Sequence, residues 1–215
     1  MVSEPVWSLG LVPRAGGLVS AARILSDGER IYDLGTGFES EPEFLETEAA
    51  LIGLGRGQVG DAVLELDAGA LAERLGRPVV AEFHVADLEL GGRGAPIGAF
   101  FYHALVRFLE IGEVLRVQTD EGGLWIDPRD SDPLQAVRLA VSEPDPELCL
   151  VTHGRRFDWP GELVRIEDID LEPEFLPAHA MAFLALRTAA GLPTSGPATT
   201  GVSAAVGGGV MYQPF

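Results

Sequence analysis

The chain has 215 residues, of which 47% are hydrophobic, and its 33 acidic residues against 15 basic ones give a formal net charge of −18. This length fits one or two small domains with an adequate hydrophobic core. So negative a surface repels nucleic-acid phosphates and anionic membranes, so we expect neither as a partner. All 15 basic residues are arginine, so no lysine is present to build a P-loop phosphate site.

The sequence shows no pattern typical of secretion or membrane insertion. Residues 1–5 contain no basic region followed by an apolar one, so we see no secretory signal. No uninterrupted apolar run approaches the roughly 20 residues needed to span a bilayer. Cys149 is the single cysteine and lies in an apolar run, which excludes an intrachain disulfide and predicts a buried thiol. We therefore predict a cytoplasmic protein.

The first third of the chain predicts antiparallel strands followed by two helices. Asp27-Gly28 is typical of a hairpin turn between strands. Ser40-Glu41-Pro42-Glu43 has the form of a capping box with proline in the first turn. A second helix is expected from Asp67, which can cap it, to the residue before Gly76. The elements expected in this part are strands at 6–12, 19–25, 30–34 and 62–66 and helices at 42–52 and 68–75.

The stretch 78–105 contains the most distinctive local pattern. It predicts a strand at 79–83, a loop with Asp87, and a glycine-rich turn at 91–94 that leads into a helix over 95–110. Glycines at a strand-to-helix turn let the backbone approach a ligand, and the helix N-terminus offers unpaired N–H groups to an anion. A tight turn without any ligand has the same pattern, so both interpretations stay open.

The second half predicts a smaller set of strands and a long closing helix. Asp127, Asp130 and Asp132 lack the ligand spacing of a calcium-binding loop, so we interpret them as a solvated turn with a helix cap. The four histidines are dispersed along the chain, without the spacing of a zinc site. The elements expected here are strands at 113–117, 124–126, 147–152, 162–166 and 206–212 and helices at 134–141 and 176–190.

Three segments carry the landmark residues of one known family: the stretch 78–105, the segment 63–80, and the closing helix with its tail. In the first stretch these landmarks are Val80, Ala81, Phe83, Asp87, Gly91, Gly92, Gly94, Ala95 and Pro96. They resemble the anhydro-N-acetylmuramic acid kinases, peptidoglycan-recycling sugar kinases of the actin/hexokinase/Hsp70-like fold. The resemblance implies an α/β fold of two small actin-like (ribonuclease H-like) lobes with mixed sheets and flanking helices. The lobes would span 1–111 and 112–215, the second without the family's helical insertion and closed by helix 176–190.

The resemblance also implies where ligands would bind. For the substrate it indicates Asp87, Gly91, Gly92, Arg93, Gly94, Arg56 and Gln58. For the nucleotide it indicates Arg14, Gly16, Gly17 and Arg155. The family's loop after the first strand carries hydroxyls and carboxylates around phosphates and Mg²⁺, whereas residues 14–20 contain no carboxylate. Asp87 is either a sugar ligand or surrogate base, or a cap on the glycine turn; the catalytic residues are unknown and no metal site is expected.

Two functions follow from these similarities and departures. The first is a degenerate kinase homologue without kinase activity or cofactor, which keeps the two-lobe framework for binding or assembly. The alternative is an ATP-dependent kinase of 1,6-anhydro-N-acetylmuramic acid in peptidoglycan recycling, which would need ATP, Mg²⁺ and a different base. Loss of the helical insertion should expose an apolar face, so we expect a homodimer or another protein partner, with a cell-wall sugar as ligand.

Overall fold

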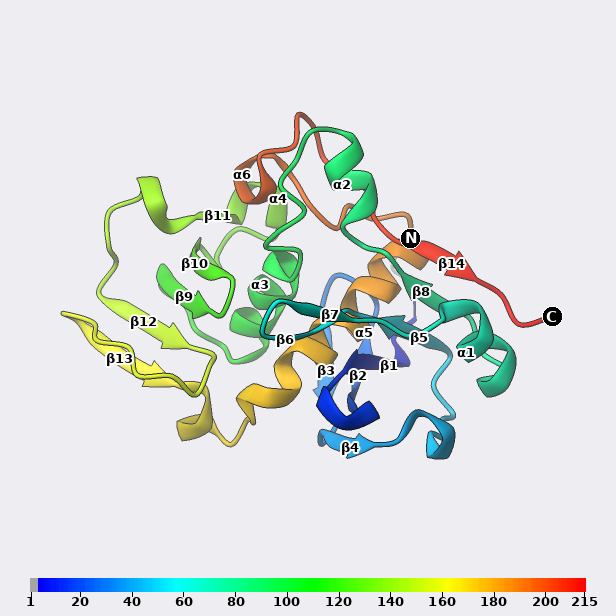
Figure 1. The fold of residues 1–215 in the computed structure, drawn as a ribbon. Coiled ribbons are helices and arrows are strands. Elements are labelled where there is room, and N and C mark those ends of the chain that lie inside the picture. The colour runs from blue at the N-terminus through cyan, green and yellow to red at the C-terminus, as the bar shows by residue number, and fades with distance from the viewer. Residues whose placement is uncertain (1–3) are drawn as a thin grey trace.

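Two β-sheets with helices between and beside them make up the structure, a computed structural model that describes residues 4–215, with Ser142 described by its backbone alone (Figure 1). The first sheet has seven strands in the order β14-β8-β5-β1-β2-β3, with β4 also paired to β2. Its strands are β1 (Val6–Pro13), β2 (Val19–Ser26), β3 (Ile31–Leu34), β4 (Phe38–Ser40), β5 (Leu51–Leu54), β8 (Val79–Ala81) and β14 (Val210–Tyr212). The antiparallel pairs β1–β2 and β2–β3 confirm the three opening strands.

The second sheet has five strands in the order β11-β10-β9-β12-β13. These are β9 (Leu115–Thr119), β10 (Gly122–Ile126), β11 (Val137–Leu139), β12 (Leu148–Val151) and β13 (Glu162–Arg165). β9 pairs antiparallel with β10 but parallel with β12, and in the first sheet β1 pairs antiparallel with β2 but parallel with β5. Both sheets are therefore mixed, as predicted. A separate hairpin consists of β6 (Gly57–Val59) and β7 (Ala62–Leu64).

Most helices are short, and α3 and α5 are the longest in the described part of the chain. The α-helices are α1 (Ala68–Leu75), α2 (Val85–Glu89), α3 (Ala99–Phe108), α4 (Pro133–Ala136), α5 (Leu176–Ala189) and α6 (Pro197–Thr200). Single 3₁₀ turns lie at η1 (Ala15–Gly17), η2 (Pro42–Phe44), η3 (Ala140–Ser142), η4 (Ile166–Ile169) and η5 (Pro173–Phe175). α1 has the predicted ends: Asp67 accepts from the Ala70 N–H at 2.9 Å, and Gly76 closes it at φ 62°.

Helix α5 lies directly on the first sheet because two strand residues have no side chain. A Cβ at Gly10 would collide with the carbonyl oxygen of Ala178, and one at Gly53 with that of Met181. The opposite face of this sheet packs against α1. The largest buried cluster joins α3, α5 and residues from both sheets, so one continuous core holds the two sheets together.

The helix predicted over 42–52 is wrong. The structure has only the short turn η2 there, followed by an extended segment and then β5. β5 lies between β1 and β8, parallel to both, and all four of its residues are buried. Burial of this strand and its two hydrogen-bonded neighbours outweighs the local helix-starting signal, which is worth only about 1 kcal/mol.

The helix predicted over 134–141 is mostly wrong for a similar reason. One turn forms, α4, and Asp132 caps it by accepting a hydrogen bond from the Leu134 N–H at 3.0 Å. The chain then becomes β11, where Val137 pairs with Ile126 and is fully buried. The cap at Asp132 is confirmed. The helix ends after one turn because residues 137–139 pair with β10 as the edge strand of the second sheet.

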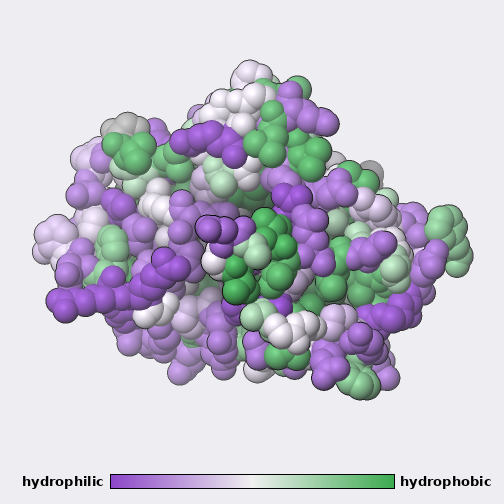
Figure 2. Space-filling model, in the orientation of Figure 1, coloured by the Kyte–Doolittle hydropathy of each residue, from purple (hydrophilic) through white to green (hydrophobic). Residues whose placement is uncertain are grey.

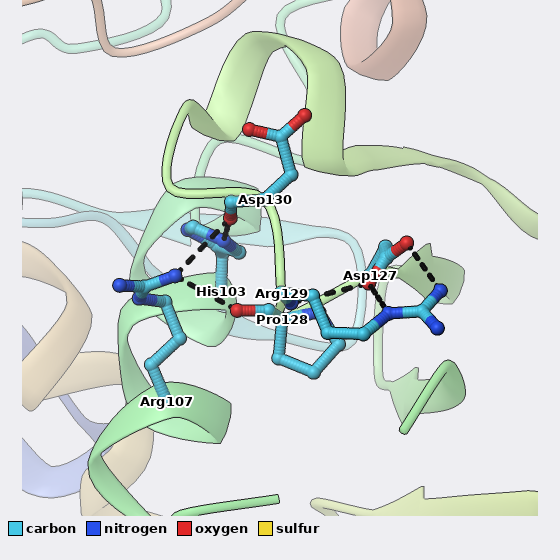
Figure 3. Close-up of polar contacts among 6 residues, drawn as sticks. All are labelled: His103, Arg107, Asp127, Pro128, Arg129 and Asp130. Atoms are coloured by element: carbon cyan, nitrogen blue, oxygen red, sulfur yellow. Dashed lines mark hydrogen bonds and ion pairs between the residues drawn. The ribbon is translucent and has the colours of Figure 1, made fainter. Parts of the chain in front are cut away.

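Helix α3 anchors the loop that precedes α4 (Figure 3). Arg107 donates to the carbonyl oxygen of Pro128 at 2.8 Å and to that of Asp130 at 3.2 Å, and His103 Nε2 lies 2.9 Å from the latter. In the same loop Arg129 forms a 2.7 Å ion pair with Asp127. The aspartates of this loop therefore serve turns and caps, as predicted.

The surface is largely hydrophilic on the face that Figure 2 shows. Small apolar groups stand out over the β6–β7 hairpin and over α2, where Val59, Val63, Leu88 and Leu90 are exposed. Cys149 is fully buried, as predicted. Among residues 4–215 we find no helix with the length and apolar character that a membrane crossing needs. Residues 1–3, part of the segment inspected for a secretory signal, lie outside the described residues.

The C-terminal segment returns to the first sheet. β14 pairs antiparallel with β8, and α5 packs against β1, β2 and β5. The first sheet thus combines residues 6–81 with 210–212, whereas the second uses 115–165. The division into lobes at 111/112 stays a prediction, and any such lobes share the closing helix, which the structure places at Leu176–Ala189.

Candidate functional site

A cavity of about 290 Å³ lies where the two sheets face each other. We call it the cleft. Its walls include Arg56 from the loop after β5, Glu82 and His84 from the loop after β8, Tyr102 from α3, and Asp120 and Glu121 from the turn between β9 and β10. Residues far apart in sequence therefore converge on one partly enclosed space, of the size that takes a small ligand.

Glu82 enters the cleft wall through an unusual backbone conformation. It follows directly on β8 and has φ 59°, in the left-handed region that non-glycine residues rarely adopt. Its carboxylate accepts a hydrogen bond from the Tyr212 hydroxyl at 2.6 Å, and this bond is the main cause that raises the pKa of Tyr212. Such a conformation costs about 1–3 kcal/mol and is concentrated at functional sites. Glu82 is therefore the first side chain of the cleft that calls for a functional explanation.

Beside Glu82 the cleft wall carries Arg56 and His84. Arg56 Nε lies 2.6 Å from Glu65 Oε1, and the two side chains are 51% and 55% exposed, so this pair contributes little to stability. Burial, followed by the positive charge of Arg56, lowers the pKa of His84. His84 therefore carries no charge at neutral pH and offers the cleft one donor and one acceptor.

The opposite wall of the cleft is the turn between β9 and β10. Thr119 Oγ1 donates to the Gly122 carbonyl at 3.0 Å and accepts from the Glu121 N–H at 3.1 Å, which fixes the turn. Although much of the Glu121 side chain is exposed, burial raises the pKa of its carboxyl, and Asp120 acts in the same direction. This wall therefore presents adjacent carboxylates to the cleft.

Tyr102 supplies a neutral donor at the base of the cleft. The side chain is 9% exposed, and its ring packs edge-on against Phe101 with centroids 5.3 Å apart. Burial is the main cause that raises the pKa of Tyr102, so the phenol keeps its proton. A protonated phenol at this depth can donate to a ligand oxygen.

The structure places Asp87 away from this cavity. It lies in α2 and is fully buried; Oδ1 accepts from the Gly94 N–H at 2.8 Å, and Oδ2 accepts from the hydroxyls of Ser195 and Thr200. A Cβ at Gly92 would collide with this carboxylate. Burial alone would raise the pKa of Asp87, but these hydrogen bonds, together with the charge of Arg93, hold it below its usual value. Asp87 thus occupies the position of a cap on the glycine turn.

The other predicted substrate residues lie in three places: the glycine turn, the cleft wall and the β6–β7 hairpin. Arg93 donates to the carbonyl oxygens of Thr199 and Thr200, so it ties the glycine turn to the C-terminal segment. From that turn Gly94 lines the cleft, and Arg56 lines it from the first sheet. Gln58 instead donates to the Gly60 carbonyl at 3.0 Å within its own hairpin.

The predicted nucleotide residues are tied to other parts of the chain. Arg14 donates to Ser20 Oγ at 2.6 Å and to the Glu174 carbonyl at 2.8 Å. Gly16 and Gly17 form η1 with positive φ angles of 78° and 80°. Arg155 forms an exposed 3.5 Å ion pair with Asp120. The β1–β2 turn therefore has the backbone N–H groups of two glycines, but the guanidinium of Arg14 is engaged in hydrogen bonds within the protein.

The residues of the β1–β2 turn do not fit Mg²⁺. Mg²⁺ in phosphoryl-transfer sites takes carboxylate and phosphate oxygens, and residues 14–20 supply no carboxylate. Over the described range 4–215, no group of three or more histidine, cysteine, aspartate or glutamate side chains is arranged to hold a metal ion.

The sequence alone did not single out most of the cleft. Glu82 was detectable as a carboxylate that follows a buried strand. His84 follows the same buried strand and Tyr102 lies in the predicted helix 95–110, but neither stands in a pattern that marks a binding residue. Asp120 and Glu121 lie in an ordinary hairpin turn, and no local pattern marks such a turn as half of a site.

Several known proteins of one name are similar to this chain, and two of them match about 70% of its length. The "Anhydro-N-acetylmuramic acid kinase" of Ruegeria sp. is 28% identical over 258 residues, covering 69% of this chain and 68% of the relative. The protein of that name from Roseobacter denitrificans is 26% identical over 264 residues, covering 73% and 68%. A shorter match to that of Cereibacter sphaeroides is 53% identical over 53 residues, covering 25% of this chain and 14% of the relative. No family model matches the chain.

The long matches also show that a piece is missing here. In the Ruegeria match, 69% of 215 residues is about 148, so about 110 of the 258 aligned positions have no counterpart in this chain. Over about 70% of its length the chain is similar to the anhydro-N-acetylmuramic acid kinases, which supports a shortened and divergent kinase-like protein, and its mixed α/β architecture is consistent with an actin-like fold.

Proposed function

We propose that this kinase-like protein binds a 1,6-anhydro amino sugar in the cleft without phosphorylating it. The observation that carries this proposal is the composition of the cleft walls. Glu82 and Glu121 offer acceptors for sugar hydroxyls, Tyr102 offers a donor, and His84 offers both. A cavity of about 290 Å³ suits one sugar ring with its substituents.

The proposed lack of phosphoryl transfer rests on the β1–β2 turn. Phosphoryl transfer depends on positioning and charge stabilisation by metal ions and a phosphate cradle. Here Arg14 is held by Ser20 and by the Glu174 carbonyl, and no carboxylate stands nearby in the turn to hold Mg²⁺. We therefore propose that the protein needs neither ATP nor Mg²⁺ to bind its sugar.

Isothermal titration with a panel of 1,6-anhydro sugars tests the binding half of this proposal. We expect at least one sugar to bind, and Glu82→Gln to weaken that binding at least tenfold, whereas the exposed Glu89→Gln leaves it unchanged. A panel without any binding at millimolar concentration would contradict the proposal. A coupled ATPase assay tests the other half, and sugar-dependent ATP consumption would contradict it.

The alternative, an ATP-dependent sugar kinase, has one observation in its favour. Glu82 is a carboxylate in a strained backbone conformation beside the cleft, and such a group could accept a proton from a sugar hydroxyl. If this alternative holds, Mg·ATP should raise the unfolding temperature, and Glu82→Gln should abolish turnover while keeping that shift.

Assembly and location stay proposals. The outer face of the second sheet carries Trp125 with Arg138 stacked 4.3 Å from its ring centroid, and Val141 nearby is 89% exposed. We propose that a second copy of the chain or another protein covers this face in the cytoplasm. Light scattering at micromolar concentration tests for the homodimer. A strictly monomeric protein would contradict the homodimer, and the proposed partner would then have to be a different protein.

A further inference from the structure

The formal charges of the cleft do not cancel. Arg56 is already paired with Glu65 at 2.6 Å, and Asp120 with Arg155 at 3.5 Å. Among residues 4–215, no arginine lies within ion-pair distance of Glu82 or of Glu121. Three carboxylate residues, Glu82, Asp120 and Glu121, and one arginine line the cavity. Glu82 accepts from the Tyr212 hydroxyl and Asp120 is paired with Arg155, so within residues 4–215 Glu121 is the lining carboxylate without a charged or hydrogen-bonded partner.

The remaining polar groups of the cleft are uncharged. Because its pKa is lowered, His84 adds no positive charge at neutral pH, and Tyr102 is a neutral phenol. The hydroxyls of Thr119 and Thr152 also line the cavity. The cleft thus holds many hydrogen-bonding partners for hydroxyl and amide groups, while Arg56, the arginine that lines it, is already engaged by Glu65.

An anionic ligand would meet repulsion that water screens only in part. Charges a few ångströms apart interact more strongly in a partly enclosed cavity than in bulk water, so a ligand carboxylate beside Glu121 would be repelled. Sugar hydroxyls, in contrast, donate well to carboxylates, and such charge-assisted hydrogen bonds are the strong ones.

We propose that the cleft selects uncharged, hydroxyl-rich sugars over sugars that carry a carboxylate, and that Glu121 is the main determinant of this selectivity. This proposal rests on the proposed sugar binding and specifies which sugars the cleft prefers. The relatives' name denotes an acid sugar, so this chain would differ from them in specificity.

A pair of nearly isosteric ligands isolates charge from size. We would titrate the full chain at low ionic strength with 1,6-anhydro-N-acetylmuramic acid and with its primary amide, in which a carboxamide replaces the carboxylate. The amide should bind about tenfold more tightly than the acid, and this ratio should shrink as salt is added.

Two variants assign the effect to one residue. Glu121→Gln should bring the amide-to-acid ratio to within about twofold by improving acid binding, whereas Glu113→Gln, an exposed residue outside the cleft with the same change in net charge, should leave the ratio unchanged. Circular dichroism confirms that both variants fold. Equal or tighter binding of the acid by the unmodified protein, or equal effects of the two variants, would overturn the inference. If neither ligand binds, nor any other sugar, it is the proposed function that fails.

Discussion

Replacing Asp87 by alanine should destabilise the ligand-free protein by about 4 kcal/mol. The carboxylate is fully buried and accepts hydrogen bonds from the Gly94 N–H and from the hydroxyls of Ser195 and Thr200. Each hydrogen bond to a charged group contributes about 1.5–3 kcal/mol, and breaking a buried charged network by removing one member costs about 3–5 kcal/mol. The loss is a large fraction of the 5–15 kcal/mol by which proteins of this kind are usually stable.

Asparagine at the same position separates the charge from the shape. Its Oδ1 can still accept from the Gly94 N–H, and its amide group can donate to the two hydroxyls, which rotate to accept. We therefore expect Asp87→Asn to cost only about 1–2 kcal/mol. Glu89→Ala, an exposed residue on the same helix, is the matched control and should change stability by less than about 0.5 kcal/mol.

Urea unfolding followed by tryptophan fluorescence measures these differences without any ligand. For a chain of this size, 4 kcal/mol corresponds to a fall in Tm of about 8–16 °C. A loss below about 1 kcal/mol for Asp87→Ala, indistinguishable from the control, would refute the assignment of Asp87 as a structural cap. The residue would then be free for the sugar-binding role that the resemblance implies.

Two further predictions concern packing and pH. Gly10→Ala should lower the free energy of unfolding in urea by about 1–3 kcal/mol, because the added Cβ would displace the backbone of α5 at Ala178. Gly112→Ala, with open space around it, should leave the free energy of unfolding unchanged. Equal effects of the two substitutions would show that α5 does not lie so close to the sheet. Burial lowers the pKa of His103 and of His179, so the unfolded state binds more protons once the pH falls below about 6.5, and stability should fall by up to about 1.4 kcal/mol per pH unit and histidine. Urea midpoints at pH 7.5 and 5.5 check this, and an unchanged midpoint would contradict it.

The local sequence by itself determined those helices and strands whose hydrophobic pattern and end signals agree with their tertiary contacts. The three opening strands, α1 between Asp67 and Gly76, and the closing helix α5 all appear where the sequence predicts them. In each case an apolar pattern, a cap or a glycine stop acts within a few residues, so nearby side chains suffice. The framework landmarks around the glycine turn likewise sufficed to indicate the similarity to the anhydro-N-acetylmuramic acid kinases.

Only the tertiary structure decided the rest. The segment 42–52 starts like a helix but ends as β5, because pairing with β1 and β8 outweighs a local cap. Asp87 becomes a buried anchor because Ser195 and Thr200, more than 100 residues away in the chain, reach its carboxylate. The cleft exists because one core holds together the sheet whose strand β8 precedes Glu82 and the sheet whose β9–β10 turn carries Glu121, and the charges of such distant residues combine only once the chain has folded.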